Sequence, residues 1–151
     1  MLAVLLGTAA ISVPTFQDGA TAGGPARPAT PSGFVASVSD EVSPAAGGLV
    51  SWTSTWQLAW RPTDDAVGYT VYAVGPEGEA SRPMTTTTAP RITLSAAAGT
   101  TTVDARLTQR DAQLAYRATQ LGVTVVAVSP DGTESTPSDV FPVGITRPPE
   151  P

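Results

Sequence analysis

The sequence predicts an all-β protein built from two packed sheets, and three observations support this prediction. The chain has 14 glycines and 15 prolines among 151 residues, spread along its length, which is typical of many short strands joined by turns. Several segments alternate apolar and polar residues, as strands with one buried face do. A 14-residue segment that begins at Thr70 also returns 54 residues later at Thr124, with identity at 8 positions.

The repeated segment has the form of a hairpin in both copies. Each copy runs from a strand with alternating faces through a Pro-acid-Gly turn into a polar strand interrupted by Pro. Glu77 and Asp131 supply the acid before Gly, and their place in a turn explains them. We interpret the repeat as two similar hairpins rather than as an internal duplication, because similar turns select similar residues.

The N-terminal residues 1–22 are expected to be a secretory leader. Residues 1–13 form an apolar run that is too short to span a bilayer as a helix. The run is followed by Ala20-Thr-Ala22, which has the small-x-small form of a signal-peptidase site. No basic residue precedes the apolar run. An N-terminal arm that is never cleaved is therefore the alternative interpretation.

Glycine and proline also set the expected domain boundaries. Residues 23–32 are rich in both and lack large apolar side chains, so they are expected to form an extended linker without core contacts. The domain is expected to span residues 33–145. Residues 146–151 are rich in Pro and are expected to form a disordered tail or linker stub.

The first two strands supply the expected core aromatics. Phe34–Val38 is predicted to be the first strand. In the second strand, Trp56 and Trp60 share the inward parity of the core. Trp52 shares this parity only if the strand is continuous, and a break near Thr53 is equally compatible with the sequence.

The third and sixth strands are the opening strands of the two repeats, over Tyr69–Val74 and Leu121–Val128. Their inward residues follow from the period of two, and are Tyr69, Val71, Ala73, Leu121, Val123, Val125 and Ala127.

The chain between these two strands contains three strand-like segments, residues 84–88, 91–94 and 101–107. We expect Thr101–Leu107 to be the fifth strand, with Arg91–Leu94 as an additional strand or an ordered loop. Residues 108–120 allow a short helix, because Leu107, Leu114 and Leu121 recur at intervals of seven in and beside this segment, but it lacks a good cap.

The order of these features resembles a fibronectin type III domain. The resemblance is carried by Pro31, by Trp60 at the end of the second strand, by Gly68-Tyr69 opening the third, and by Ala127-Val-Ser-Pro-Asp-Gly132. It covers residues 31–143. It implies an immunoglobulin-like two-sheet β-sandwich of about seven strands, with the third and sixth strands adjacent in one sheet and an extended segment between them in sequence.

The composition excludes most enzyme chemistry. The chain has no His, Cys or Lys, so Ser-His-Asp, Cys-His and Ser-Lys catalytic arrangements cannot form. The adjacent acids Asp64 and Asp65 lie in a predicted loop and are interpreted as solvated turn residues. No calcium-loop pattern is present, and the net charge of −5 without basic runs does not favour nucleic acid. We expect no catalytic residue, no metal site and no cofactor.

The outward face of the third and sixth strands is the candidate partner-binding patch. Tyr72, Val74, Val126 and Val128 are expected to lie together there, and contiguous exposed apolar surface usually marks an interface. Residues 108–120 could instead fold over this face, which would make it a second small core. Both arrangements are compatible with the sequence.

These observations lead to three functional hypotheses. The first is a non-catalytic module at a bacterial surface or in the extracellular space, which serves adhesion, spacing or binding of a protein or a cell-surface polymer. Its mature domain is expected not to span a membrane, and self-association is compatible with it. Because the resemblance extends to phage decoration and tail modules, a virion structural protein is the second. Similar domains accompany polysaccharide hydrolases, so an accessory carbohydrate-binding module is the third.

Overall fold

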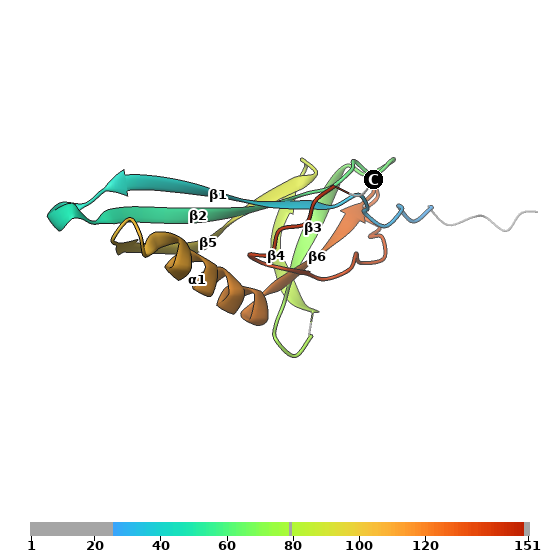
Figure 1. Cartoon of the computed structure of the whole chain (residues 1–151). Coiled ribbons are helices and arrows are strands. Elements are labelled where there is room, and N and C mark those ends of the chain that lie inside the picture. The colour runs from blue at the N-terminus through green and yellow to red at the C-terminus, as the bar shows by residue number, and fades with distance from the viewer. Residues whose placement is uncertain (1–25, 79, 150–151) are drawn as a thin grey trace, which may run out of the picture.

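The computed structural model of the protein describes residues 26–78 and 80–149, so the expected leader at residues 1–22 lies outside the described residues. The described chain is mostly β, as the sequence predicts (Figure 1). Its elements are β1 (Val35–Pro44), a 3-10 helix (Ala46–Gly48), β2 (Val50–Ala59), β3 (Gly68–Val74), β4 (Ala80–Thr87), β5 (Arg91–Thr101), α1 (Arg106–Gln120), β6 (Gly122–Val128) and β7 (Phe141–Pro142).

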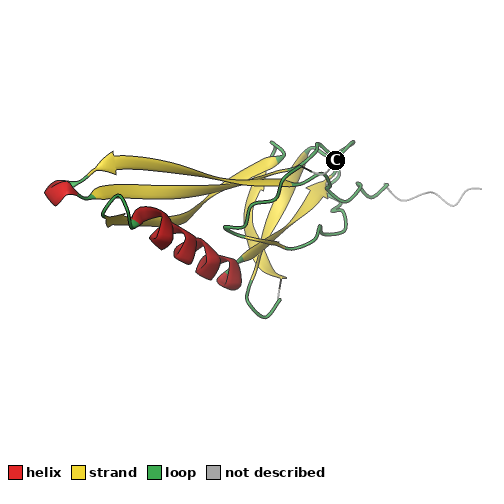
Figure 2. Cartoon of the chain, viewed as in Figure 1, coloured by secondary structure: helices red, strands yellow, loops and turns green. Residues whose placement is uncertain are grey.

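The strands form two antiparallel sheets, with the orders β1-β2-β5 and β4-β3-β6-β7. Strand β3 pairs with β6 along its whole length, so the expected adjacency of the third and sixth strands is confirmed. The three-stranded sheet projects well beyond the other sheet, and α1 lies along this projection (Figures 1 and 2). The described chain is therefore a sandwich at one end and a helix on a sheet at the other.

The two repeated hairpins differ in their second strands. The first hairpin consists of β3 and the eight-residue strand β4, which pair with two register shifts. In the second, residues 133–138 run beside β6 with only a single bridge, between Val128 and Glu134, and β7 pairs with β6 over two residues. Pro137 in this return segment has no N–H to donate to a regular ladder.

Strand β2 carries the core along its inner face. Trp52, Trp56 and Trp60 are 2%, 0% and 5% exposed, which confirms the core role predicted for Trp56 and Trp60 and adds Trp52 to it. The break considered near Thr53 is wrong. Strand β5 pairs with β2 over its whole length and accommodates a single register shift in the middle.

Aromatic rings join the two sheets at the sandwich end. The ring centroid of Phe34 lies 4.3 Å from that of Phe141 and 5.8 Å from that of Trp60. Trp60 in turn packs edge-on against Tyr69 at 5.2 Å. The inward residues Val71, Val123, Val125 and Ala127 complete this core and are fully buried.

The fifth strand differs from the prediction. Strand β5 is Arg91–Thr101, whereas residues 101–107 end β5 and begin α1. The sequence signal was weak because the run of alanines before Gly99 does not alternate between apolar and polar residues. Small residues fit here because a Cβ on Gly99 would lie 3.0 Å from the ring of Trp52.

Helix α1 packs on the three-stranded sheet, mainly against β5. The helix that the leucine spacing allows is therefore present. The interpretation that residues 108–120 cover the outer face of β3 and β6 is wrong, because α1 packs mainly on β5. Its N-cap residue Ala105 makes no side-chain cap hydrogen bond, whereas Leu114 is 8% exposed. Packing rather than capping therefore holds α1 in place.

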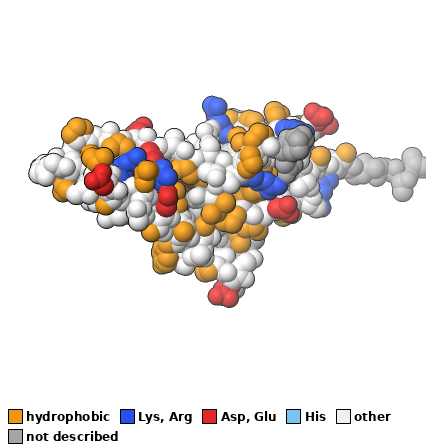
Figure 3. All heavy atoms as spheres, viewed as in Figure 1, with side chains coloured by type: hydrophobic (Ala, Val, Ile, Leu, Met, Phe, Trp, Pro, Cys, Tyr) orange, Lys and Arg blue, Asp and Glu red, His pale blue; other side chains and the backbone are white. Residues whose placement is uncertain are grey.

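An acidic residue on β1 ties α1 to the sheet. The Asp40 carboxylate accepts hydrogen bonds from Ser54 Oγ at 2.6 Å, Arg106 Nη1 at 2.9 Å and Arg110 Nη1 at 2.6 Å. Figure 3 shows basic and acidic side chains side by side on this face. Partial burial opposes ionisation of Asp40, but hydrogen bonds from the serine and the two arginines outweigh burial and lower the carboxyl pKa. We call this cluster the Asp40 clamp.

The chain after β7 passes close to α1 and the core. Trp56 Nε1 donates a hydrogen bond to the carbonyl oxygen of Ile145 at 2.8 Å. At Gly144 the backbone has a φ of +101°, and an added Cβ would lie 2.9 Å from the carbonyl oxygen of Leu114. Glycine is needed here both for the backbone angle and for the close approach.

Both ends of the domain extend further than predicted. Pro28 and Pro31 are buried, so this part of the expected linker contacts the domain. The backbone N–H and carbonyl of Arg147 both bond to Ala36, at 2.9 Å, so β-pairing continues into the expected tail. The unpaired edge of β1 explains this extension, because edge strands offer free backbone groups to any extended segment alongside.

Replacing Asp40 with Asn removes the negative charge of the Asp40 clamp. We expect Asp40→Asn to lower the free energy of unfolding by about 1–3 kcal/mol at neutral pH, because two arginines lose a charged partner. Since the folded-state pKa is lowered, the wild-type advantage is complete above the ordinary value of 3.8 and is lost as the pH falls through the folded-state value. Urea denaturation across this range measures both effects.

The matched control for this change is Glu41→Gln, at the exposed neighbouring position. It should change the free energy of unfolding by less than about 0.5 kcal/mol. Equal effects of the two variants would contradict a specific role for the Asp40 clamp.

Gly144→Ala and Gly47→Ala separate crowding from backbone strain. Both glycines have positive φ, +101° and +72°, but the space around Gly47 is open. In each variant, backbone strain should lower the free energy of unfolding by about 1 kcal/mol. Gly144→Ala should lose a further 1–3 kcal/mol, roughly, because the new methyl group collides with α1. Thermal unfolding followed by tryptophan fluorescence tests the difference, and equal losses would refute the close contact.

Candidate functional site

The acidic residues singled out in the sequence lie in turns. Asp64 and Asp65 are exposed in the loop before β3. Glu77 and Asp131 precede glycines whose N–H groups close the turns, to Gly75 at 3.0 Å and to Ser129 at 2.9 Å. The turn interpretation of Glu77 and Asp131 is therefore confirmed. Within residues 26–78 and 80–149, no three His, Cys, Asp or Glu side chains are grouped so that they could hold a metal ion.

The predicted patch of Tyr72, Val74, Val126 and Val128 is not an exposed apolar surface. Val126 is 2% exposed and Val74 is 3% exposed, while the other two residues are partly buried. The Tyr72 hydroxyl donates a hydrogen bond to Glu134 Oε1 at 2.9 Å. Because β6 lies between β3 and the bridge to Glu134, this link crosses the outer face of β6 past Val126. The pKa of Tyr72 is raised, chiefly because burial disfavours the charged phenolate and secondly because the Glu134 carboxylate accepts its hydrogen bond and repels its negative charge.

Residues 133–138 complete the edge of β6 through serine side chains. The N–H of Ala127 donates to Ser135 Oγ at 2.9 Å, and the N–H of Val125 donates to Ser138 Oγ at 3.0 Å. These hydroxyl groups accept where a regular strand would present carbonyl oxygens. The patch therefore has little surface to offer a partner, and binding by its residues stays a prediction without exposed area to support it.

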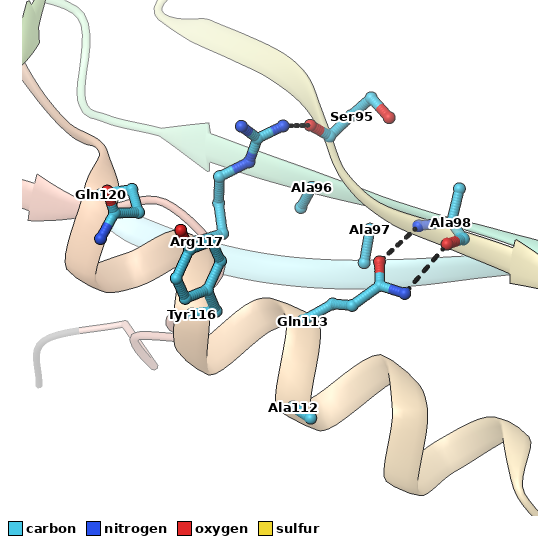
Figure 4. A pocket seen from close by; sticks show the side chains of 9 residues that line it. All are labelled: Ser95, Ala96, Ala97, Ala98, Ala112, Gln113, Tyr116, Arg117 and Gln120. Atoms are coloured by element: carbon cyan, nitrogen blue, oxygen red, sulfur yellow. Dashed lines mark hydrogen bonds between the residues drawn. The ribbon is translucent and has the colours of Figure 1, made fainter.

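The arrangement that does face solvent is a groove between α1 and β5, which we call the α1–β5 groove. It has a volume of about 590 Å³. Strand β5 forms its floor and α1 its wall (Figure 4). Its lining residues are Ser95, Ala96, Ala97 and Ala98 from β5, and Ala112, Gln113, Tyr116, Arg117 and Gln120 from α1.

Two side chains cross from α1 to the backbone of β5. The Gln113 amide accepts a hydrogen bond from the N–H of Ala98 at 3.2 Å and donates to its carbonyl oxygen at 3.1 Å. One turn later, Arg117 Nη2 donates to the carbonyl oxygen of Ser95 at 3.4 Å. Figure 4 shows both crossings. They occupy backbone groups on the edge of β5 that does not pair with β2, and they fix α1 relative to that edge.

The solvent-facing part of the groove combines an aromatic ring with polar groups. Tyr116 is 68% exposed. Arg117 carries the only formal charge among the lining residues, and no carboxylate lines the groove. The floor is made of alanines, which leave room above them. Among the residues that line the groove, no nucleophile is paired with a base.

A second hollow borders Val128, one residue of the predicted patch. It has a volume of about 530 Å³ and is lined by Val67, Thr70, Thr86, Val128 and neighbouring residues of β3 and β4. Its lining has no charged residue, and its one aromatic residue, Tyr69, is 4% exposed. It therefore offers fewer groups for specific recognition than the α1–β5 groove.

Sequence reasoning missed the α1–β5 groove. Residues 108–120, which include Gln113, Tyr116 and Gln120, were predicted only to form a short helix or to cover the outer face of the third and sixth strands. The available signal was the spacing of Gln113, Arg117 and Gln120, which recur at three and four residues and so share one helix face. That spacing alone does not say which strand the face meets.

No family model, curated protein or solved structure matches this chain. Among the described residues, α1 and the 3-10 helix are both too short or too polar to cross a membrane.

The Gln113 crossing can be tested by amide hydrogen exchange. We expect Gln113→Ala to reduce protection of the Ala98 amide by about three- to tenfold, because its hydrogen-bond acceptor is lost. Gln109→Ala changes an exposed glutamine one turn earlier that does not line the groove, and it should leave this amide unaffected. Unchanged exchange in Gln113→Ala would mean that the crossing contributes nothing in solution.

Proposed function

We propose that this protein is a non-catalytic, exported module of the fibronectin type III type that binds a partner at a bacterial surface through the α1–β5 groove. The observation that carries the proposal is the groove itself. Its wall is tied to its floor by Gln113 and Arg117, and Tyr116 stands exposed beside them. A site whose walls are already fixed loses little conformational entropy when it binds.

The family assignment is supported by the order of the strands. Three strands, β1-β2-β5, face four strands, β4-β3-β6-β7. Strands β3 and β6 are neighbours, as the resemblance implies, and the chain between them is long. Helix α1 lies within this extra length. On this proposal, α1 is an insertion into a fibronectin type III-like sandwich, and the insertion supplies the binding site.

The non-catalytic assignment is supported by the residues available. The chain lacks His, Cys and Lys altogether. Asp40 is held by two arginines, and Glu134 by Tyr72. An acid that is already committed to structural bonds is a poor general base, because proton transfer would break those bonds. Export is supported by the apolar residues 1–13 and the small-x-small site that follows them.

The proposal is tested by retention of the protein on insoluble cell envelope from the organism that produces it. The full chain is used as recovered from that source. We expect wild type to cosediment with the envelope, and Tyr116→Ala to need at least about tenfold more protein for half-saturation, because an exposed aromatic at the centre of a contact carries a large share of binding. Thr108→Ala, an exposed change on α1 outside the groove, should behave as wild type.

Each result of this experiment decides a separate point. Absence of retention for wild type would contradict the binding function, and equal retention of Tyr116→Ala would contradict the groove as its site. Protease treatment of the envelope separates a protein partner from a polymer. The intact mass of the retained chain reports whether residues 1–22 have been removed, and an uncleaved chain found in virus particles would favour the virion alternative instead.

A further inference from the structure

The backbone edge of β5 in the α1–β5 groove is already occupied. Ala98 uses both its N–H and its carbonyl oxygen with Gln113, and the carbonyl oxygen of Ser95 accepts from Arg117. A peptide that binds by adding a strand needs these groups free. The ligand of this groove must therefore be recognised by side chains, which disfavours an extended peptide paired to β5.

The side chains left available include donors, acceptors and an aromatic face. In the part of the chain that the structure describes, neither the Ser95 hydroxyl nor the side-chain oxygen of Gln120 has a hydrogen-bond partner. The ring of Tyr116 lines the same groove and is 68% exposed. Sugar hydroxyl groups both donate and accept, and the C–H face of a pyranose is apolar. In the groove, Ser95 and Gln120 can hydrogen-bond to such hydroxyl groups, and the ring of Tyr116 can pack on such an apolar face.

The charge of the groove adds a second requirement. A guanidinium group has five N–H donors, and Arg117 spends one of them on a 3.4 Å contact with Ser95. No carboxylate lines the groove, and the nearby Asp111 is bound to Arg110. The remaining donors of Arg117 form a fork that matches a carboxylate. A cationic sugar would meet an uncompensated positive charge.

We propose that the α1–β5 groove binds a saccharide that carries a carboxylate. Tyr116 stacks on a pyranose ring, Arg117 pairs with the carboxylate, and Ser95 and Gln120 bond to sugar hydroxyls. The volume of about 590 Å³ lies within the usual range of small-ligand sites. The inference rests on the proposed binding function and names the chemistry of its ligand.

Two disaccharides that differ by one acidic group test the inference. N-acetylglucosaminyl-N-acetylmuramic acid and N,N′-diacetylchitobiose share their linkage and N-acetyl groups, but only the first has a lactyl carboxylate. Each is titrated into the full chain while backbone amide NMR signals are followed. We expect the acidic disaccharide to bind about tenfold more tightly, with the largest shifts at residues 95–98 and 116–120, and the preference to weaken with added salt.

Three variants separate the contributions to binding. Arg117→Gln should bind both sugars equally, because it keeps hydrogen-bonding capacity and loses the charge. Tyr116→Ala should weaken both sugars at least about tenfold, and Thr108→Ala should bind as wild type. Thermal unfolding of each variant verifies that the fold is retained, so that a loss of binding is not a loss of structure.

Equal binding of the two sugars by wild type, or shifts confined to residues outside the groove, would overturn the inference. If neither sugar binds while Tyr116→Ala still loses retention on envelope, the saccharide inference fails and the binding function stands with another ligand class. If wild type is not retained on envelope either, the proposed function fails with it.

Discussion

Burial of the tryptophans along the inner face of β2 is the constraint on which the rest of the structure depends. Trp52 and Trp56 lie in β2, Trp60 directly follows it with the same alternation, and all three side chains are buried. These three indoles lie within nine residues, and the three-stranded sheet that contains β2 projects well beyond the four-stranded sheet (Figure 1). Because exposed tryptophan surface on this scale is unfavourable, the projecting half needs its own cover. Helix α1 supplies that cover, and the α1–β5 groove follows from its placement.

Helix α1 is held by polar contacts at its two margins and by packing between them. The Asp40 clamp fixes its first turns from the side of β1, while Gln113 and Arg117 reach the edge of β5. The close approach of Gly144 limits its position near the sandwich end. These contacts hold α1 in a defined position although it has no capping side chain. Because α1 is the wall of the α1–β5 groove, the wall does not need to rearrange on binding.

Side-chain hydrogen bonds also complete the edge of β6. Serine hydroxyls replace missing carbonyl partners there, and the Tyr72–Glu134 link crosses the outer face. On this outer face Val74 and Val126 are buried, and Tyr72 and Val128 are partly buried. The two tyrosines therefore differ in their environment. The Tyr72 hydroxyl is hydrogen-bonded to Glu134, whereas Tyr116 is exposed on the surface.

The sequence by itself determined the β-rich fold, the two Pro-acid-Gly turns, and the inward parity of Trp56 and Trp60, because period and turn chemistry are local properties. The tertiary structure alone decided the continuity of β2 through Trp52, the extension of β5 through its alanines, and the sheet on which α1 lies. It also decided which apolar residues stay exposed. These outcomes depend on which surfaces meet, and a one-dimensional pattern states that a face is apolar without stating what covers it.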